Sequence, residues 1–153
     1  MKRRTYDSKI GKITIYEKDN CITKIVLNDS KSYSEYNSPI IQETIEQIEQ
    51  YFTGKRRVID VPVTYSGSAF KKAVLSQIRS IEYGQTSSYK ELAMAAGYPD
   101  ANRAVGTACK TNPLPLIIPC HRVIRSDGSL GEFAGGKEMK KTLIELEKSY
   151  NID

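Results

Sequence analysis

The sequence has few of the residues that bind metals or form disulfides. Its 153 residues include three cysteines, one histidine and no tryptophan. Cys21, Cys109 and Cys120 are odd in number and widely spaced, which argues against a disulfide framework. No Cys-x-x-Cys pair accompanies His121, so the usual Cys/His zinc site cannot be assembled. We therefore expect neither a metal nor another cofactor.

Long hydrophobic runs are also missing. No stretch approaches the ~20 apolar residues of a membrane span. Polar residues 5–9 follow the basic start, where a signal peptide would continue with apolar residues. We therefore expect a protein of the reducing cytoplasm with no membrane partner. The composition, 39% hydrophobic and 27% charged with a net charge of +5, is typical of one ordinary globular domain or two small ones.

The first part of the chain predicts a small sheet and a helix. Residues 12–17 alternate polar and apolar side chains, Asp19-Asn20 supplies a turn, and residues 21–27 resume the extended pattern, as in a hairpin. A helix over 39–52 follows, with proline at its first position. Its apolar positions recur at helical spacing, at Ile41, Ile45, Ile48 and Phe52.

The second part opens with a helix at Ser68 and continues with a helix-turn-helix pattern. Ser88-Tyr-Lys-Glu91 has the form of a capping box, so a helix begins there and ends before Gly97. After a four-residue turn, a second short helix runs from about Ala101 to Lys110. Its predicted buried face is formed by Ala101, Ala104, Val105 and Ala108, and its open face by Arg103, Gly106 and Lys110.

The distribution of charge is more informative than its sum. Residues 101–126 contain no carboxylate and four bases, which are Arg103, Lys110, Arg122 and Arg125. A basic stripe beside such a helix is typical of DNA-binding proteins, although a solvated helix face gives the same pattern.

Cys120 lies in the most unusual segment, 112–124. Three prolines within seven residues predict a fixed, extended backbone. A thiol is nucleophilic only as thiolate, and positive neighbours such as His121 and Arg122 lower its pKa. Because adjacent side chains of an extended chain point to opposite sides, we expect a water to link the thiol to the imidazole. We also expect a carboxylate from elsewhere to orient the ring, and structural roles for Cys21 and Cys109.

This segment resembles the active site of the O6-alkylguanine-DNA alkyltransferases. The resemblance runs from Phe70 to Glu147. It rests on Pro-Cys-His-Arg-Val at 119–123, Asn112-Pro-Leu-Pro before it, the glycines after it, and the helix pair with Ser-Tyr-x-x-Leu-Ala and Arg-Ala-Val-Gly. It implies an α/β (α+β) fold. A small sheet-plus-helix domain, ribonuclease H-like in the family, spans 1–66, and a mostly helical, winged-helix-like domain with the helix-turn-helix spans 67–153.

The resemblance also implies a reaction. An alkyl group passes from O6 of guanine in double-stranded DNA, and more weakly from O4 of thymine, irreversibly to Cys120, once per protein molecule. His121 takes the thiol proton through a water and is held in its tautomer by Glu147. Arg103 enters through the minor groove and fills the space of the extruded nucleotide. Tyr89 lies near the rotated phosphate and donates its hydroxyl to the leaving base. The other implied residues are Asn112 at the turn before the active-site segment, Lys90, Lys110 and Ser126 as DNA contacts, and Pro115, Val123, Phe133 and Ala134 around the substrate pocket. The implied partner is DNA, bound by a monomer.

Three positions depart from the family pattern. Ala134 stands where many members have serine, so one hydroxyl donor is lost. Phe133 replaces a frequent tyrosine, and Tyr98 stands where asparagine can contact DNA. The zinc that some animal relatives bind in the N-terminal domain has no ligands here.

Other functions remain open at this point. A non-catalytic relative would bind alkylated DNA, but such relatives replace the acceptor cysteine, whereas Cys120 is present. A helix-turn-helix regulator with Cys120 as a redox sensor would explain the basic window but not the accompanying histidine and glutamate. A cysteine hydrolase would need a direct dyad, for which adjacent Cys120 and His121 are poorly placed.

Overall fold

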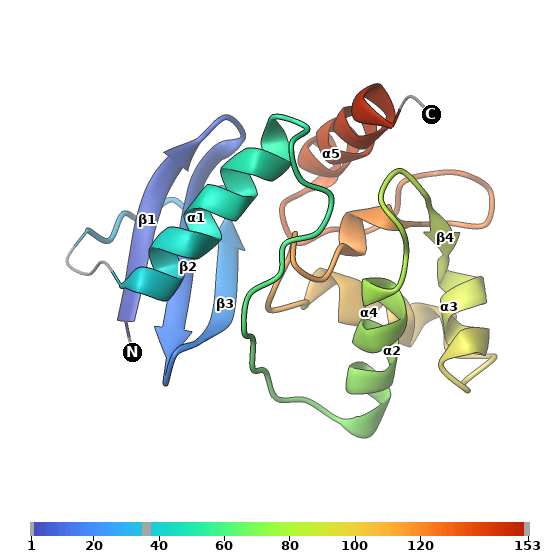
Figure 1. Ribbon diagram of the computed structural model, residues 1–153. Helices are drawn as coiled ribbons and strands as arrows, with labels where there is room; N and C mark the ends of the chain where they lie inside the picture. The colour runs from blue at the N-terminus through green and yellow to red at the C-terminus, as the bar shows by residue number, and fades with distance from the viewer. Residues whose placement is uncertain (1, 35–37, 152–153) are drawn as a thin grey trace. The chain divides into compact units, whose positions relative to one another are not determined.

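The computed structural model of the protein describes residues 2–34 and 38–151 and confirms a mixed α/β fold (Figure 1). The chain packs as two compact units. The first comprises Met1–Tyr65 together with Pro113–Ile117, and the second comprises Ser66–Asn112 and Ile118–Asp153. The short segment Pro113–Ile117 thus packs with the first unit, although it lies in the middle of the second unit's sequence.

The first unit is a three-stranded antiparallel sheet with one helix. The strands β1 (Lys2–Ser8), β2 (Gly11–Lys18) and β3 (Cys21–Leu27) pair in the order β1-β2-β3. The predicted hairpin is confirmed as β2 and β3. Asp19 and Asn20 between them have φ of 51° and 63°, as a two-residue hairpin turn of type I′ requires. The edge strand β1 was not predicted, because it buries no side chain and therefore shows little apolar alternation.

The helix of the first unit is confirmed as α1 (Pro39–Phe52). The side chain of Ser38 caps it by accepting a 3.2 Å hydrogen bond from the N–H of Ile41. The helix packs against all three strands (Figure 1). The core of this unit includes fully buried Ile13, Ile15, Ile22, Ile41 and Ile48.

The second unit is mostly helical. Helices α2 (Ala69–Arg79), α3 (Tyr89–Ala95) and α4 (Asn102–Lys110) contact one another, and α5 (Lys137–Tyr150) packs on a single 3-10 turn, η1 (Cys120–Arg122). Two short strands, β4 (Ser87–Ser88) and β5 (Val123–Ile124), pair in parallel. None of the helices in residues 2–34 and 38–151 is long and apolar enough to cross a membrane.

The helix-turn-helix is confirmed with two differences. The capping box between Ser88 and Glu91 begins α3, as predicted. The connection to α4 is longer than the predicted four residues, because Gly97 takes a φ of 90° and the N–H of Tyr98 bonds to the carbonyl of Ala93, ending α3 at Ala95. The buried face of α4 is also different. It consists of Val105, Ala108 and Cys109, which share one stripe at helical spacing, whereas Ala104 is exposed.

Candidate active site

Cys120 lies in the 3-10 turn that precedes β5, so the predicted extended backbone is wrong at this point. Proline lacks an N–H but keeps its carbonyl, and the carbonyl of Pro119 accepts a 2.9 Å hydrogen bond from Arg122 that closes the turn. Adjacent side chains of a 3-10 turn are roughly 120° apart rather than opposite. The geometric reason for keeping the Cys120 and His121 side chains apart therefore no longer holds.

A carboxylate orients the imidazole of His121. Nε2 of His121 lies 2.5 Å from Oε2 of Glu147 on α5, and both side chains are buried. Burial lowers the pKa of His121, so the ring is neutral at pH 7. Burial alone would raise the pKa of the Glu147 carboxyl, but hydrogen bonds from His121 and Arg122 outweigh it and hold that pKa at about 2. The ionised carboxylate therefore accepts the Nε2–H, and Nδ1 carries the basic lone pair.

Arg122 holds the other side of the same carboxylate. Its Nε donates to Oε1 of Glu147 at 2.9 Å and its Nη2 to Oε2 at 3.0 Å, in a bidentate pair. The N–H of Gly84 also donates to Oε1, and Nη1 of Arg122 donates to the carbonyl of Ile81. The expectation that Arg122 lowers the pKa of the neighbouring thiol is therefore wrong, because its charge pairs with Glu147.

Burial dominates the electrostatics of the thiol itself. The side chain of Cys120 is fully buried, and this raises its pKa to about 11. Two other side chains lower the pKa of Cys120. Nδ2 of Asn112 donates to Sγ at 3.2 Å, and the positive charge of Lys140 favours the thiolate. Asn112 also donates to the carbonyl of Ile118 at 2.8 Å, so one side chain holds both the sulfur and the backbone two residues before it.

Lys140 is a site residue that was not predicted from the sequence. It is fully buried on α5, and its Nζ donates to the carbonyl of Glu132 at 3.0 Å and to the hydroxyl of Tyr89 at 3.4 Å. Burial lowers its pKa to about 8. A sequence signal existed, because Lys140 precedes buried Leu143 and Glu147 by three and seven residues and so shares their helix face.

Tyr89 is held in a dense set of hydrogen bonds. Its hydroxyl donates to the carbonyl of Glu132 at 3.3 Å and accepts from the N–H of Glu132 at 3.0 Å. Burial raises its pKa to about 12, so it stays a neutral donor. Gly131 has a φ of 74°, and a Cβ at this position would collide with the Tyr89 hydroxyl. The glycine is therefore needed for the close approach of the loop.

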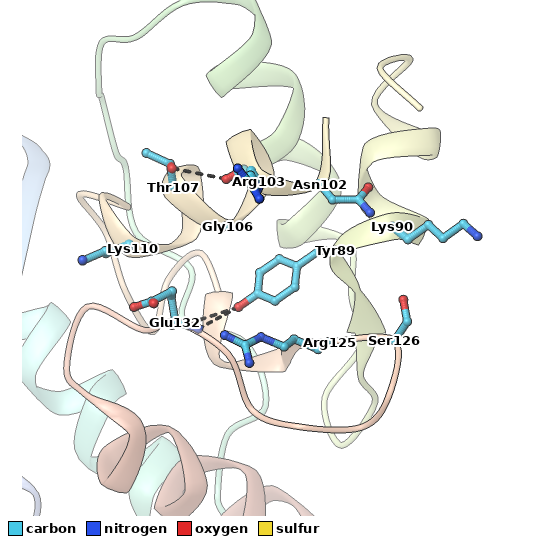
Figure 2. A pocket seen from close by; sticks show the side chains of 10 residues that line it. All are labelled: Tyr89, Lys90, Asn102, Arg103, Gly106, Thr107, Lys110, Arg125, Ser126 and Glu132. Atoms are coloured by element: carbon cyan, nitrogen blue, oxygen red, sulfur yellow. Dashed lines mark hydrogen bonds between the residues drawn. The ribbon is translucent and has the colours of Figure 1, made fainter. Parts of the chain in front are cut away.

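Tyr89 also faces a hollow of about 450 Å³ on the second unit (Figure 2). Five predicted site residues line this hollow, namely Tyr89, Lys90, Arg103, Lys110 and Ser126. Arg125 and Glu132 line it as well, and neither was among the predicted site residues. The thiol of Cys120 has no exposed surface and does not line the hollow, whereas Tyr89, which lines it, accepts a hydrogen bond from buried Lys140.

The remaining predicted pocket residues are less closely grouped. The ring of Phe133 stands edge-on to the imidazole of His121, with centroids 6.3 Å apart. Val123 is buried in β5, whereas Ala134 is exposed. Pro115 is buried in the segment that packs with the first unit. Among the described residues, no three His, Cys, Asp or Glu side chains are grouped so that they could hold a metal ion.

Comparisons with known proteins cover almost the whole chain, and they all match the same kind of protein. Residues 1–65 match the ribonuclease-like domain of 6-O-methylguanine DNA methyltransferase, and residues 69–149 match its DNA binding domain. A methylated-DNA--protein-cysteine methyltransferase of Mycolicibacterium paratuberculosis is 36% identical over 97% of this chain and 93% of its own length. The constitutive enzyme of that name from Bacillus subtilis is 33% identical over 94% and 93%.

Solved structures give the same result. The OGT protein of Mycobacterium tuberculosis in complex with DNA has a TM-score of 0.88 at 36% identity, covering 97% of this chain and 93% of that chain. An O6-methylguanine DNA methyltransferase from Methanococcus jannaschii has a TM-score of 0.71 at 28% identity, covering 94% and 92%. Two domain profiles that together span almost the whole sequence, and relatives above 30% identity over nearly their full length, place the chain in one family. The chain belongs to the 6-O-methylguanine DNA methyltransferase family.

Proposed function

We propose that this chain repairs DNA by direct reversal, transferring the alkyl group from O6 of guanine in double-stranded DNA irreversibly to Sγ of Cys120. The observation that carries the proposal is the buried series of Cys120, His121 and Glu147, with the carboxylate 2.5 Å from the imidazole. Family membership supports it, since relatives 33–36% identical are named methylated-DNA--protein-cysteine methyltransferases. O4-alkylthymine is a weaker substrate in this proposal.

The reaction balances without a cofactor. Sγ of Cys120 attacks the alkyl carbon, the Sγ–C bond forms, and the C–O6 bond breaks with its electron pair leaving on guanine. The thiol proton passes to His121 through a water, and the hydroxyl of Tyr89 donates to the departing base. Backbone groups of Cys120 and Val123 accept hydrogen bonds from the guanine amino group. The guanine anion takes up one proton, which balances the proton lost by the thiol. The products are guanine in DNA and a thioether that no neighbouring group can hydrolyse, so each molecule acts once.

The pKa of the thiol decides how the proton leaves. With a pKa of about 11, the thiol is almost entirely protonated at pH 7. A preformed thiolate is therefore scarce, and His121 removes the proton as the attack proceeds. The neutral imidazole, oriented by Glu147, is suited to this role.

The substrate base must also leave the helix. O6 lies inside the base stack, and extruding the nucleotide costs a few kcal/mol. We assign the exposed Arg103 of α4 to the vacated space, and Lys90, Lys110 and Ser126 to the DNA backbone, because all four line the hollow beside Tyr89. The thiol is fully buried, so the side chains that cover it must shift when the base enters.

We also propose how the two parts of the chain divide the work. Residues 1–66 form the ribonuclease-like domain and residues 67–153 carry both DNA binding and transfer. The protein works as a cytoplasmic monomer. Phe133 and Ala134, together with Pro115 and Val123, set the range of alkyl groups.

Mass measurement of the acceptor peptide tests the proposal. The protein is incubated with a duplex containing O6-methylguanine, and the tryptic peptide carrying Cys120 is weighed. We expect a gain of one methyl group, never more than one per molecule, and no gain in Cys120→Ser, whose DNA affinity stays close to the original. Cys21→Ser, a half-exposed hairpin position, serves as the control and should react normally.

Two outcomes contradict transfer to Cys120. An unmodified peptide combined with tight binding of the alkylated duplex indicates a non-catalytic binder. A methyl group found on a different residue, with Cys120→Ser still active, shows that the acceptor is wrong.

A further inference from the structure

Arg125 occupies one wall of the hollow and has no part in the series that ends at Cys120. It follows β5 directly and lines the hollow together with Tyr89 and Glu132. Figure 2 shows its side chain running beneath the Tyr89 ring, with the guanidinium toward the hydroxyl. The positive charge of Arg125 also acts on the pKa values of Tyr89 and Lys140, which agrees with this closeness.

The sheet register explains why Arg125 and Tyr89 are neighbours. Strands β4 and β5 are parallel, with Ser88 opposite Ile124. Tyr89 and Arg125 are the residues that follow directly after these two strands, so both leave the sheet at the same end. This position is independent of α4, which supplies Arg103 from the other wall.

The backbone of Arg125 is fixed by a tight turn. Its N–H donates to the carbonyl of Ser129 at 2.9 Å, and its carbonyl accepts from the N–H of Gly128 at 2.9 Å. Asp127, the carboxylate within this turn, accepts instead from the N–H and the hydroxyl of Ser129 at 2.9 and 2.7 Å. The side chain therefore starts from a defined point at the rim.

The guanidinium itself is exposed and available to an outside anion. Within residues 2–34 and 38–151 it forms no hydrogen bond and no ion pair. Guanidinium groups carry five donors in a planar fork that matches phosphate oxygens. A fixed, unpaired arginine at the rim of a hollow that receives a nucleotide has the chemistry of a phosphate clamp.

We propose that Arg125 binds the phosphodiester of the extruded nucleotide while its base occupies the pocket. The inference rests on the proposed function and adds a positioning contact to it. Arg103 and Arg125 then have separable tasks. Arg103 fills the gap in the base stack, so it affects the rate of transfer mainly when a complementary strand is present. Arg125 holds the nucleotide itself, so it affects the rate with single-stranded and double-stranded DNA alike.

Three substrates separate these tasks: a duplex with O6-methylguanine, the same strand without its complement, and free O6-benzylguanine base. We expect Arg125→Ala to slow alkyl transfer from duplex and from single strand alike, by about tenfold to a hundredfold. The reaction with the free base, which has no phosphate, should keep its rate. Arg103→Ala should slow the duplex reaction far more than the single-strand reaction.

Two further variants sharpen the result. Arg125→Lys should recover only part of the rate, because an ammonium keeps the charge but not the bidentate fork. Arg79→Ala removes an exposed arginine of α2 that does not line the hollow and is the matched control. The slope of log K for duplex binding against log salt should fall by about one in Arg125→Ala and less in the control.

The inference is wrong if Arg125→Ala slows the free base as much as the strands, which would mean a contact to the base. It is also wrong if only the duplex reaction is slowed, or if none is. Failure of the unaltered protein to alkylate Cys120 with any of the three substrates would instead contradict the proposed function.

Discussion

Three groups from distant parts of the sequence control Cys120. Asn112 donates to the sulfur, Lys140 supplies a buried positive charge that favours the thiolate, and Glu147 orients His121. None of these acts on an exposed thiol, since burial raises the pKa of Cys120 to about 11. Burial therefore keeps the thiol protonated until an electrophile enters the site.

Glu147→Gln should lower the free energy of unfolding at neutral pH and should make that free energy less sensitive to a fall in pH. The carboxyl has a pKa of about 2 in the folded protein against an ordinary value of 4.5, which corresponds to about 3 kcal/mol of stability at neutral pH. Because the folded pKa is the lower one, this contribution is complete above pH 4.5 and is lost as pH falls toward 2. About 2 kcal/mol should be gone by pH 3.

Urea unfolding from pH 7 to pH 3 measures this effect. The gap in unfolding free energy between the original protein and Glu147→Gln should narrow as pH falls below about 4.5. Glu145→Gln on the exposed face of α5 is the control and should leave the profile unchanged. A gap that stays constant over this range would contradict the buried, ionised carboxylate.

Lys140→Met should shift the titration of the thiol. The charge of Lys140 lowers the pKa of Cys120, so its loss should raise that pKa further and move the rate of Cys120 alkylation by free O6-benzylguanine to higher pH. In the original protein, Lys140 should no longer lower the pKa of Cys120 above about pH 8, because it loses its proton there. Lys141→Met, an exposed neighbour, should leave the pH profile in place. An unchanged profile in Lys140→Met would exclude the electrostatic role.

Short elements, rather than long ones, position the site. Strands β4 and β5 have two residues each and η1 has three, yet they place Tyr89, Cys120 and Arg125. Each depends on a neighbour. Strand β4 runs straight into the capping box of α3, and η1 packs on α5. The start of α3 therefore sets where the Tyr89 side chain begins.

Ser88→Ala should weaken this start. The Ser88 hydroxyl accepts a 3.0 Å hydrogen bond from the N–H of Glu91, and the loss of such a cap costs about 1 kcal/mol. We expect a Tm lower by roughly 2–4 °C in thermal unfolding. Transfer should be slower because Tyr89 is the first residue of the helix. Ser87→Ala, outside the cap, should have a smaller effect, and an equal loss in both variants would argue against the capping box as the cause.

The two units are not divided by a single boundary in the sequence, because the first unit also includes a short segment from the second half of the chain. Pro113–Ile117 belongs to the first unit, where the carbonyl of Pro113 accepts a 2.8 Å hydrogen bond from Ile25. Leu114, Leu116 and Ile117 in this segment are buried. The residues immediately after it lead to Cys120, so the segment that approaches the thiol is fixed by the unit that contributes no acceptor or DNA contact in the proposed reaction.

A fragment of residues 66–153 should therefore be less stable than its own helices suggest. Without the first unit, three apolar side chains of the segment lose their packing partners and become exposed. We expect earlier urea unfolding and binding of a hydrophobic dye. The control is the full chain cut between residues 65 and 66 with both pieces present. A fragment as stable as the cut chain would contradict the structural role of the first unit.

Local sequence patterns determined much of the fold. The β2–β3 hairpin, α1 and the capping box of α3 were predictable because alternation, helical spacing and caps act within a few residues. The edge strand β1 and the exact buried face of α4 were not, since neither carries a clear local pattern and both depend on what packs against them. Family resemblance, carried by the segment 119–123 and its surroundings, named the candidate residues but could not give their protonation states.

Tertiary structure decided the electrostatics. The sequence places Arg122 beside Cys120, and it therefore suggested an arginine that activates the thiol. The fold instead turns that arginine to Glu147 and brings in Lys140, twenty residues further along the chain. Charge acts through space, and burial, which sets the pKa of Cys120, exists only once distant segments have closed around the sulfur. Neighbours in the sequence thus predicted which residues matter, and only the packing determined which charge acts on the thiol.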